Sequence, residues 1–241
     1  MGIKASASAG RFLIDWYHTQ MRNAPAVDWS AIDTVLLDMD GTLLDLRFDN
    51  WFWQDLIPQR YATARNMSQP EAWASLAPKF HATRGTIQWY CIEYWTRELN
   101  LDIAGIKREA LSQVSFLPGA EEFLLKLRLR GKRRVLVTNA HPVTLAIKNE
   151  RIALATYVDA SYSTHQFDAP KEDAAFWPRL AAAESFAPQR TLLVDDSLAA
   201  LDAARDFGIA WLRAVRCPDS SRPPQNTGSY AAVDRVADLI E

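Results

Sequence analysis

Short apolar runs alternate with helix-forming segments over most of the chain, and this alternation limits the fold more than any other feature of the sequence. Short apolar runs bounded by turn residues are typical of strands that are buried on both faces. Strands that alternate with helices at this spacing predict an α/β fold, in which helices cover both faces of a parallel sheet. The expected strands occupy residues 35–37, 135–137, 157–163, 191–194 and 209–215, and the expected helices occupy residues 120–130, 141–151, 171–185 and 198–207.

One long segment, residues 48–117, interrupts the alternation. About 70 residues are too many for a loop in a compact domain, and this segment favours helices and is rich in aromatic residues. We therefore expect a helical cap at 48–117, inserted into a core domain made of 31–47 and 118–241. An N-terminal extension at 1–30 precedes the core, and its apolar residues 12–17 would form either a short docking helix or a mobile arm. A short amphipathic helix is expected near the C-terminus, after a polar, proline-rich stretch.

The composition argues against several classes of protein. The formal net charge is -2 and the pI is about 6.1, so no basic field is available to bind nucleic acid through its backbone. No stretch approaches the ~18 apolar residues of a membrane span, and no signal-peptide pattern is present. Neither a disulfide framework nor a zinc cluster can be made from the two cysteines, Cys91 and Cys217. We expect a soluble, cytoplasmic protein, and the oligomeric state stays open.

Polar residues follow three of the expected strands at the point where each strand ends. Asp38 and Asp40 follow the first strand, Thr138-Asn139 the second, and Asp195-Asp196 a later one. In parallel sheets of this kind, ligands bind at the carboxyl ends of the strands. The sequence therefore predicts a functional site where these three pairs meet.

The pair Asp38 and Asp40 carries the clearest chemical signal. Two carboxylates at the end of a buried strand are costly unless a cation compensates their charge. Mg²⁺ suits carboxylate oxygens and is commonly bound by one or two of them together with a phosphate. A carboxylate can also act as a nucleophile, and its neighbour can transfer a proton. An Asp-x-Asp sequence is often a solvated turn, but the preceding apolar run and the following Gly41-Thr42 argue against that interpretation here.

The other candidate residues are weaker signals when each is taken alone. Thr138-Asn139 could be ordinary turn chemistry, and Asp195-Asp196 could be a helix N-cap with a charged neighbour. Lys171 follows Pro170 and could simply begin a helix, although a cation is unfavourable at a helix N-terminus. All of these residues in this order are far more specific than any single one.

Together these residues resemble the motifs of the haloacid dehalogenase-like (HAD) phosphatases over residues 33–215. The resemblance implies a Rossmann-like core with a helical cap inserted after the first strand. The matching positions are Asp38-Met39-Asp40-Gly41-Thr42 for the first motif, Thr138 for the second, Lys171 for the third and Asp195-Asp196 for the fourth.

The resemblance also implies a role for each residue. Asp38 would attack phosphorus and form an aspartyl-phosphate, while Asp40 would act first as an acid and then as a base. The phosphoryl oxygens would be held by Thr138, Asn139 and Lys171.

The cofactor implied by the resemblance is Mg²⁺. Its ligands would be the Asp38 carboxylate, the Asp40 main-chain carbonyl and Asp196, with Asp195 close by. Many members carry a further acid where this chain has Ala200. The adjacent pair Asp195-Asp196 is the other form found in the family, so this difference affects only the detailed metal geometry.

Longer segments resemble one branch of this superfamily, the bacterial GMP/IMP 5'-nucleotidases. Asp40 favours phosphate ester cleavage, because dehalogenase members lack an acid at this position. Pump ATPases with a similar first motif need membrane spans, which this sequence lacks. The resemblance to the nucleotidases implies purine nucleoside monophosphates as substrates. It rests on residues 35–46, 48–50, 52–54, 89–91, 138–142, 163–165 and 170–173.

The aromatic residues of the expected cap suit such a substrate, because stacking of a base on Trp or Tyr contributes ~1–3 kcal/mol. Most of these aromatics should nevertheless form the core of the cap. We regard His141 and His165 as loop groups beside the motifs rather than catalysts.

The function expected from the sequence is thus a Mg²⁺-dependent phosphatase that converts GMP or IMP to nucleoside and phosphate. A sugar-phosphate phosphatase or a phosphomutase of the same superfamily is the alternative within enzymes. A non-catalytic binding protein would be expected to lose motif residues that this chain retains.

Overall fold

The computed structural model describes residues 26–240. Residues 1–25, which include most of the expected N-terminal extension and the apolar group at 12–17, lie outside the described residues, as does residue 241. Within the described range, parallel strands form one sheet in the order β3-β2-β1-β4-β5-β6. These strands are β1 (Thr34–Leu37), β2 (Arg133–Thr138), β3 (Ala160–Ser163), β4 (Thr191–Asp195), β5 (Trp211–Val215) and β6 (Ala232–Val233).

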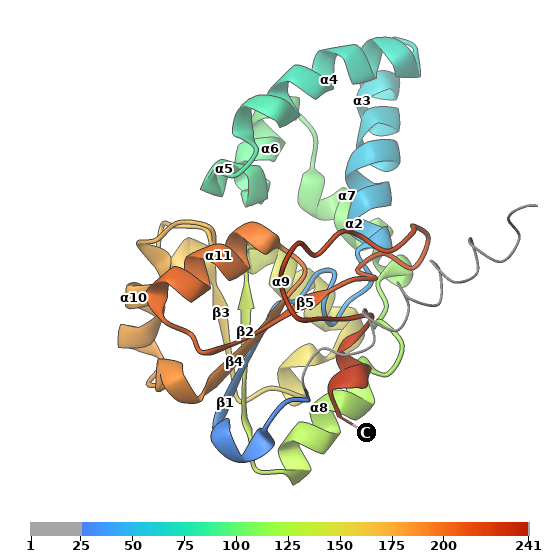
Figure 1. Ribbon diagram of the computed structural model, residues 1–241. Coiled ribbons are helices and arrows are strands. Elements are labelled where there is room, and N and C mark those ends of the chain that lie inside the picture. The colour runs from blue at the N-terminus through green and yellow to red at the C-terminus, as the bar shows by residue number, and fades with distance from the viewer. Residues whose placement is uncertain (1–25, 241) are drawn as a thin grey trace, which may run out of the picture.

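Strand β1 lies in the middle of the sheet, and its side chains alternate between the two faces. Val35 and Leu37 pack into the hydrophobic core on one face, and Leu36 packs into the core on the other; all three are fully buried. Helices α8 and α9 contribute to the first core, and α10 and α11 to the second (Figure 1). The predicted α/β fold is confirmed. The helices are α8 (Ala120–Leu129), α9 (Pro142–Ile152), α10 (Phe176–Ala183) and α11 (Leu198–Phe207).

Two segments differ from the expectation. Helix α10 begins at Phe176 rather than at 171, because the N–H of Asp173 donates to the Pro170 carbonyl at 2.9 Å and the N–H of Phe176 donates to the Asp173 carbonyl at 3.0 Å. These turns separate Lys171 from the helix. Near the C-terminus, β6 and a 3-10 helix, η7 (Val236–Leu239), replace the expected amphipathic α-helix. The pairing of β6 with β5 fixes the chain there and leaves too few residues for a longer helix.

Helical elements follow β1 and cover the carboxyl edge of the sheet from above (Figure 1). Helix α2 passes without a break into a π-helical turn and then into α3. The exact cap boundaries, 48 and 117, stay a prediction. The elements are α2 (Arg47–Trp51), η2 (Phe52–Leu56), α3 (Ile57–Arg65), α4 (Gln69–Thr83), α5 (Ile87–Tyr90), α6 (Ile92–Leu99) and α7 (Ile103–Glu109).

Aromatic side chains form the core of these inserted helices. Trp95 is almost fully buried, and its ring lies 5.1 Å from that of Phe80 and 5.8 Å from that of Trp53. Such edge-on and tilted contacts between rings are favourable beyond the burial of their area. Among residues 26–240, no helix is both long and apolar enough to cross a bilayer.

Candidate active site

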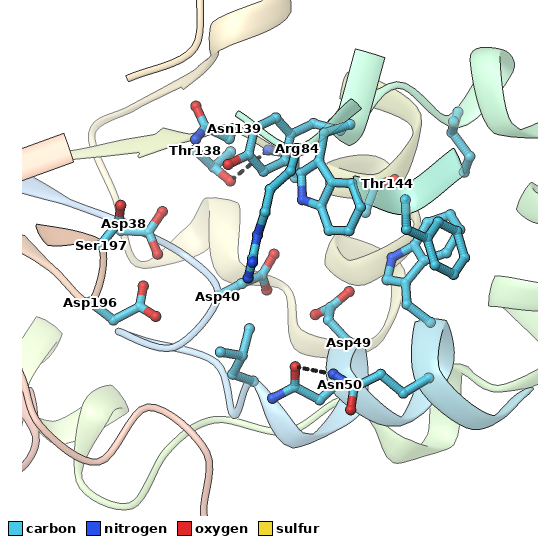
Figure 2. Close-up of a pocket in the computed structure, with 18 of the residues that line it drawn as sticks. Asp38, Asp40, Asp49, Asn50, Arg84, Thr138, Asn139, Thr144, Asp196 and Ser197 are labelled. Atoms are coloured by element: carbon cyan, nitrogen blue, oxygen red, sulfur yellow. Dashed lines mark hydrogen bonds between the residues drawn. The ribbon is translucent and has the colours of Figure 1, made fainter. Parts of the chain in front are cut away.

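A cavity of about 830 Å³ lies between the inserted helices and the carboxyl edge of the sheet. Figure 2 shows carboxylates and hydroxyl or amide groups of the core on one side of it and residues of the inserted helices on the other. The sequence-predicted site residues that line it are Asp38, Asp40, Thr138, Asn139, Lys171, Asp195 and Asp196. The structure thus brings all of them together, although their chemical roles stay predictions.

Asp38 is placed by the backbone that continues β1. Its N–H donates to the Val194 carbonyl at 3.1 Å, which extends the pairing with β4 by one residue. Its Oδ1 accepts from Lys171 Nζ at 2.5 Å, and the same Nζ donates to Asp195 Oδ2 at 2.6 Å. Burial and the Asp195 charge raise the pKa of Asp38 to about 7, although Lys171 opposes this. The two carboxylates outweigh the effect of burial on Lys171 and raise its pKa, so it stays charged.

Three carboxylates form an acidic cluster: oxygens of Asp38, Asp195 and Asp196 lie within 4.8 Å of one another. Lys171 compensates the first two. The Asp196 carboxylate makes no hydrogen bond or ion pair with any residue of the described range. Burial and the Asp38 and Asp195 charges raise the pKa of Asp196 well above its ordinary value. A cluster of oxygens that still lacks positive charge fits a hard divalent cation.

The tight turn after β1 brings the main chain close to this cluster. Main-chain N–H groups of Leu43 and Leu44 both donate to the Met39 carbonyl, at 3.0 and 2.8 Å. Gly41 adopts φ +91° in this turn, and a Cβ there would come within 2.7 Å of Asp196. The site therefore needs glycine at 41, both for the backbone conformation and for the space next to Asp196.

Asp40 points away from the cluster, toward two buried lysines. Its Oδ1 accepts from Lys148 Nζ at 2.6 Å, and Lys148 also donates to Asp49 Oδ2 at 2.5 Å. Lys107 Nζ donates to the other oxygen of Asp49 at 3.1 Å. Burial and the neighbouring Asp49 charge raise the pKa of Asp40 to about 7. Burial would also raise the pKa of Asp49, but the two lysines outweigh it and lower that pKa to about 2.

The Asn139 side chain makes hydrogen bonds to the loop that contains Lys171 and Glu172. Its Oδ1 accepts from the main-chain N–H of Lys171 at 2.9 Å, and its Nδ2 donates to both oxygens of Glu172, at 3.0 and 3.2 Å. Tyr90, from the inserted helices, also donates to Glu172, at 3.3 Å. Thr138 Oγ1 accepts from the N–H of Ala140 at 3.0 Å (Figure 2). The Asn139 side chain thus positions Lys171, and its direct contact with phosphate stays a prediction.

Sequence reasoning missed the buried lysines Lys107 and Lys148, which are 2 % and 1 % exposed. A signal was present. Each lysine lies four residues after the first member of a buried helical stripe, which is Ile103, Ile106, Lys107 in α7 and Thr144, Ile147, Lys148 in α9. A lysine on the apolar side of a helix is unusual, because an unpaired buried charge is expensive. Their partner Asp49 lies in segment 48–50, which resembles the bacterial GMP/IMP 5'-nucleotidases, but the sequence predicted no role for it.

His141 and His165 do not line the cavity. His141 Nε2 lies 2.8 Å from Glu93 Oε2, and the two histidine rings meet edge to face with centroids 4.6 Å apart. Burial and the His141 charge together lower the pKa of His165 to about 4.

Part of the aromatic set lines the cavity, whereas others, such as Trp95, are packed within the inserted helices. Arg84, which follows α4, also lines the cavity. Figure 2 shows its side chain extending toward the core carboxylates. The aromatic residues that line the cavity are Trp53, Trp73, Phe80, Trp89 and Tyr90.

A parallel sheet with an acid cluster at its carboxyl edge, covered by inserted helices, is the arrangement expected for a phosphatase of the HAD type. The family model "haloacid dehalogenase-like hydrolase" matches residues 32–208. The chain belongs to this family, and it is a phosphoric monoester hydrolase that acts on a small phosphate ester.

Within this class, the chain is 43% identical over 194 residues to the GMP/IMP nucleotidase YrfG of Escherichia coli (strain K12). The match covers 80% of this chain and 87% of that protein. The GMP/IMP nucleotidase YrfG of Shigella flexneri matches equally well.

Solved structures share the fold at lower identity. A HAD phosphatase from Thermococcus onnurineus superimposes with a TM-score of 0.72 at 19% identity, covering 86% of this chain and 96% of that chain. An L-2-haloacid dehalogenase from Xanthobacter autotrophicus does so with a TM-score of 0.60 at 18% identity and the same coverage. These likenesses concern the fold alone.

Proposed function

We propose that the protein is a Mg²⁺-dependent 5'-nucleotidase that hydrolyses GMP and IMP through an aspartyl-phosphate on Asp38. The observation that carries this proposal is the contact of Lys171 with both Asp38 and Asp195 beside an uncompensated Asp196. The proposed nucleophile, the lysine proposed to bind phosphate and the acidic cluster thus share one small volume.

In the first step, an Asp38 oxygen forms a bond to phosphorus while the bond from phosphorus to the 5' oxygen of the nucleotide breaks. Asp40 gives its proton to that leaving oxygen. In the second step, Asp40 takes a proton from a water molecule, which attacks phosphorus and releases Asp38 and phosphate. Lys171 and Thr138 hold the phosphoryl oxygens throughout, and Asn139 keeps the Lys171 loop in place.

The donor set fits Mg²⁺ held by the carboxylates of Asp38 and Asp196 and by the main-chain carbonyl of Asp40, with Asp195 close by. When bound, the metal ion supplies positive charge where negative charge develops on the transferring group, which is the main source of catalysis in reactions of this kind.

Protonation of Asp40 fits its role as the acid. With a pKa of about 7, the Asp40 side chain is protonated in a large share of the protein molecules at neutral pH, whereas an ordinary aspartic acid would be ionised. The contact with Lys148 fixes the direction of the carboxyl group. We infer that this contact positions the proton for the leaving oxygen.

The cavity supports a purine nucleotide as the substrate. Indole and phenyl rings line the side formed by the inserted helices, where a base could stack. Arg84 offers only hydrogen-bond donors, which match the O6 and N7 acceptors shared by guanine and hypoxanthine and not the amino group of adenine. The identity with the GMP/IMP nucleotidase of E. coli supports the same substrates.

Phosphate release from IMP tests the mechanism. We expect turnover that requires Mg²⁺, stops with a chelator and returns when Mg²⁺ is added. Asp38→Asn should lose at least about 1,000-fold of the activity, because the nucleophile is gone. Asp202→Asn, a change of the same chemistry at an exposed helix position, is the matched control and should keep full activity. Asp38→Asn with wild-type activity would overturn the mechanism.

A further inference from the structure

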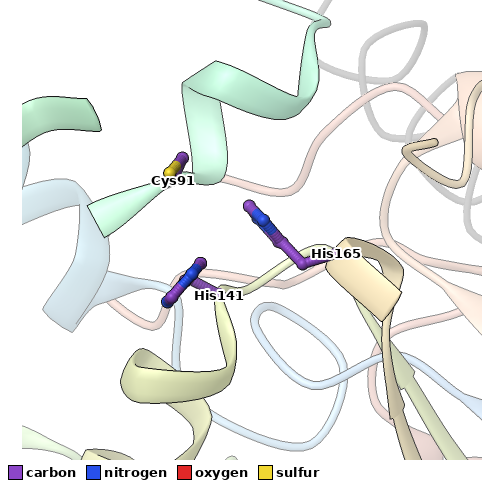
Figure 3. A group of neighbouring side chains, drawn as sticks. All are labelled: Cys91, His141 and His165. Atoms are coloured by element: carbon purple, nitrogen blue, oxygen red, sulfur yellow. The ribbon is translucent and has the colours of Figure 1, made fainter. Parts of the chain in front are cut away.

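A second group of possible metal ligands lies outside the active-site cavity, at the junction between the inserted helices and the core. One ligand atom each of Cys91, His141 and His165 lies within 4.8 Å of the others. Figure 3 shows Cys91 at the start of α6 facing the two imidazoles, which stand on the core at the N-terminus of α9 and in the turn after β3. The three side chains come from segments that are 50 and 24 residues apart in the sequence.

One polar atom of this group has no partner in the part of the chain that the structure describes. His165 Nε2 is buried and has no hydrogen-bond partner among residues 26–240. Leaving a buried ring nitrogen unpaired is unfavourable, and such exceptions call for an unseen water or ion. Glu93 joins the group, because its Oε2 lies 2.8 Å from His141 Nε2 and 3.7 Å from Cys91 Sγ. The N–H of Tyr94 donates to Cys91 Sγ at 3.4 Å and helps to hold the sulfur in place.

We propose that Cys91, His141 and His165 form a zinc site, with Glu93 as the fourth ligand. One thiolate, two imidazoles and a carboxylate are a set that Zn²⁺ accepts in tetrahedral geometry. With Zn–S near ~2.3 Å and Zn–N near ~2.1 Å, the ligand atoms would lie about 3.5 Å apart. The ligand atoms of Cys91, His141 and His165, which lie within 4.8 Å of one another, would have to approach by at most about 1.3 Å to reach this geometry.

Binding releases one proton, from the Cys91 thiol, to solvent. His141 Nδ1 accepts from the N–H of Val143 at 3.3 Å, so in the neutral ring the proton sits on Nε2. Coordination through Nε2 moves this proton to Nδ1 and gives up that long hydrogen bond. Sequence reasoning considered only the two cysteines as zinc ligands and missed the histidines, which the fold brings to Cys91.

A metal at this position would tie the inserted helices to the core at the edge of the active-site cavity. Cys91 directly follows Tyr90, which lines the cavity and contacts Glu172, and His141 follows Asn139 by two residues. Enzymes with a cap over the site must open it to admit substrate and release product. Zinc would therefore hold the cap closed and slow turnover.

Co²⁺ is a suitable probe, because a thiolate ligand gives it an intense near-ultraviolet charge-transfer band that carboxylate ligands do not. The full-length protein is titrated with Co²⁺ in excess Mg²⁺, which occupies the acidic cluster. We expect the band to saturate at one Co²⁺ per chain in the wild type and in Cys217→Ser, the matched cysteine control. The band should be absent in Cys91→Ser, and His165→Gln should weaken Co²⁺ binding at least tenfold.

The result that overturns the site is the absence of a thiolate band in the wild type, or a band that survives in Cys91→Ser. His165→Gln keeps the test valid if Cys91→Ser does not fold, and an unchanged affinity in His165→Gln also overturns the site. For the effect on turnover, micromolar Zn²⁺ at fixed Mg²⁺ should slow the wild type and Cys217→Ser more than Cys91→Ser. Equal inhibition of all three proteins would assign the inhibition to the acidic cluster. It would overturn the inference that zinc holds the cap closed.

Discussion

Lys148 Nζ donates to Asp40 Oδ1 at 2.6 Å from the inward side of α9, so a buried cation holds the proposed acid of the active site. The same nitrogen contacts Asp49 of α2, which belongs to the inserted helices. Lys148 thus links the residue that moves protons to the layer that covers the cavity. A change in the position of these helices would reach Asp40 through this contact.

Lys148→Met should lower kcat for IMP by about 10- to 100-fold and leave KM nearly unchanged, because a misplaced proton donor affects the reaction more than binding. Steady-state kinetics measure the two constants, and thermal unfolding is followed in parallel. Lys126→Met removes a half-exposed lysine that pairs with Glu122 and serves as the control. A wild-type kcat in Lys148→Met would mean that Asp40 needs no partner.

Asp40→Asn should separate the two proton transfers. With IMP, whose leaving oxygen needs a proton, we expect the rate to fall by about 100- to 10,000-fold. With an aryl phosphate, whose leaving group is stable without a proton, the first step should persist and give a burst of phenolate. Rapid-mixing kinetics record the burst, after which turnover should stall because no base activates water. An equal fall in the rate of the first step with IMP and with the aryl phosphate would contradict the role of Asp40 as an acid.

Gly41→Ala should raise the Mg²⁺ concentration needed for half-maximal activity at least about tenfold, because the new Cβ displaces the Asp196 carboxylate. Left-handed backbone strain of about 1–2 kcal/mol is added as well. Gly208→Ala controls for the strain alone, since φ there is +104° and no atom lies within 4 Å of an added Cβ. Activation by Mg²⁺ that is equally altered in both variants would remove the link between Gly41 and the metal.

The metal-free protein should lose stability as pH rises from about 4 to about 7. In this range the folded protein keeps protons on Asp38, whose pKa is raised from 3.8 to about 7, and on Asp196, whereas the unfolded chain has released them. The free energy of unfolding therefore falls by up to about 1.4 kcal/mol per pH unit for each such proton. Bound Mg²⁺ keeps these carboxylates ionised, so it should raise Tm more at pH 7.5 than at pH 5.

Thermal unfolding in chelator and in Mg²⁺ over this pH range provides the measurement. Asp196→Asn lacks one of the raised groups and should show a flatter pH profile in chelator. The same slope in both proteins, or a larger Mg²⁺ effect at pH 5, would show that the acidic cluster does not govern this dependence.

The sheet was predictable because the strand patterns are strong. Leu36 and its neighbours are apolar on both faces, as only a central parallel strand requires, and the polar residues at the strand ends fall at one edge. Element ends were less predictable. The start of α10 depends on turns around Asp173, and β6 is only two residues long.

The site could be predicted where its residues lie close together in the sequence, as Asp38 and Asp40 do. Contacts between distant segments could not. The buried stripe of α9 indicates that Lys148 is buried, but nothing in the sequence identifies Asp40, 108 positions away, as its partner. His165 approaches His141 only because β2 and β3 are neighbours in the sheet.

Substrate choice is tested most directly by kcat/KM for phosphate release, measured with Mg²⁺ for IMP, GMP, AMP, UMP and glucose 6-phosphate. We expect IMP and GMP to exceed each of the others by at least about tenfold, because Arg84 and the aromatic wall of the cavity favour a 6-oxopurine. The Arg84→Gln variant should narrow the difference between IMP and AMP without changing hydrolysis of an aryl phosphate. Glucose 6-phosphate or UMP hydrolysed as efficiently as IMP and GMP would contradict the proposed function.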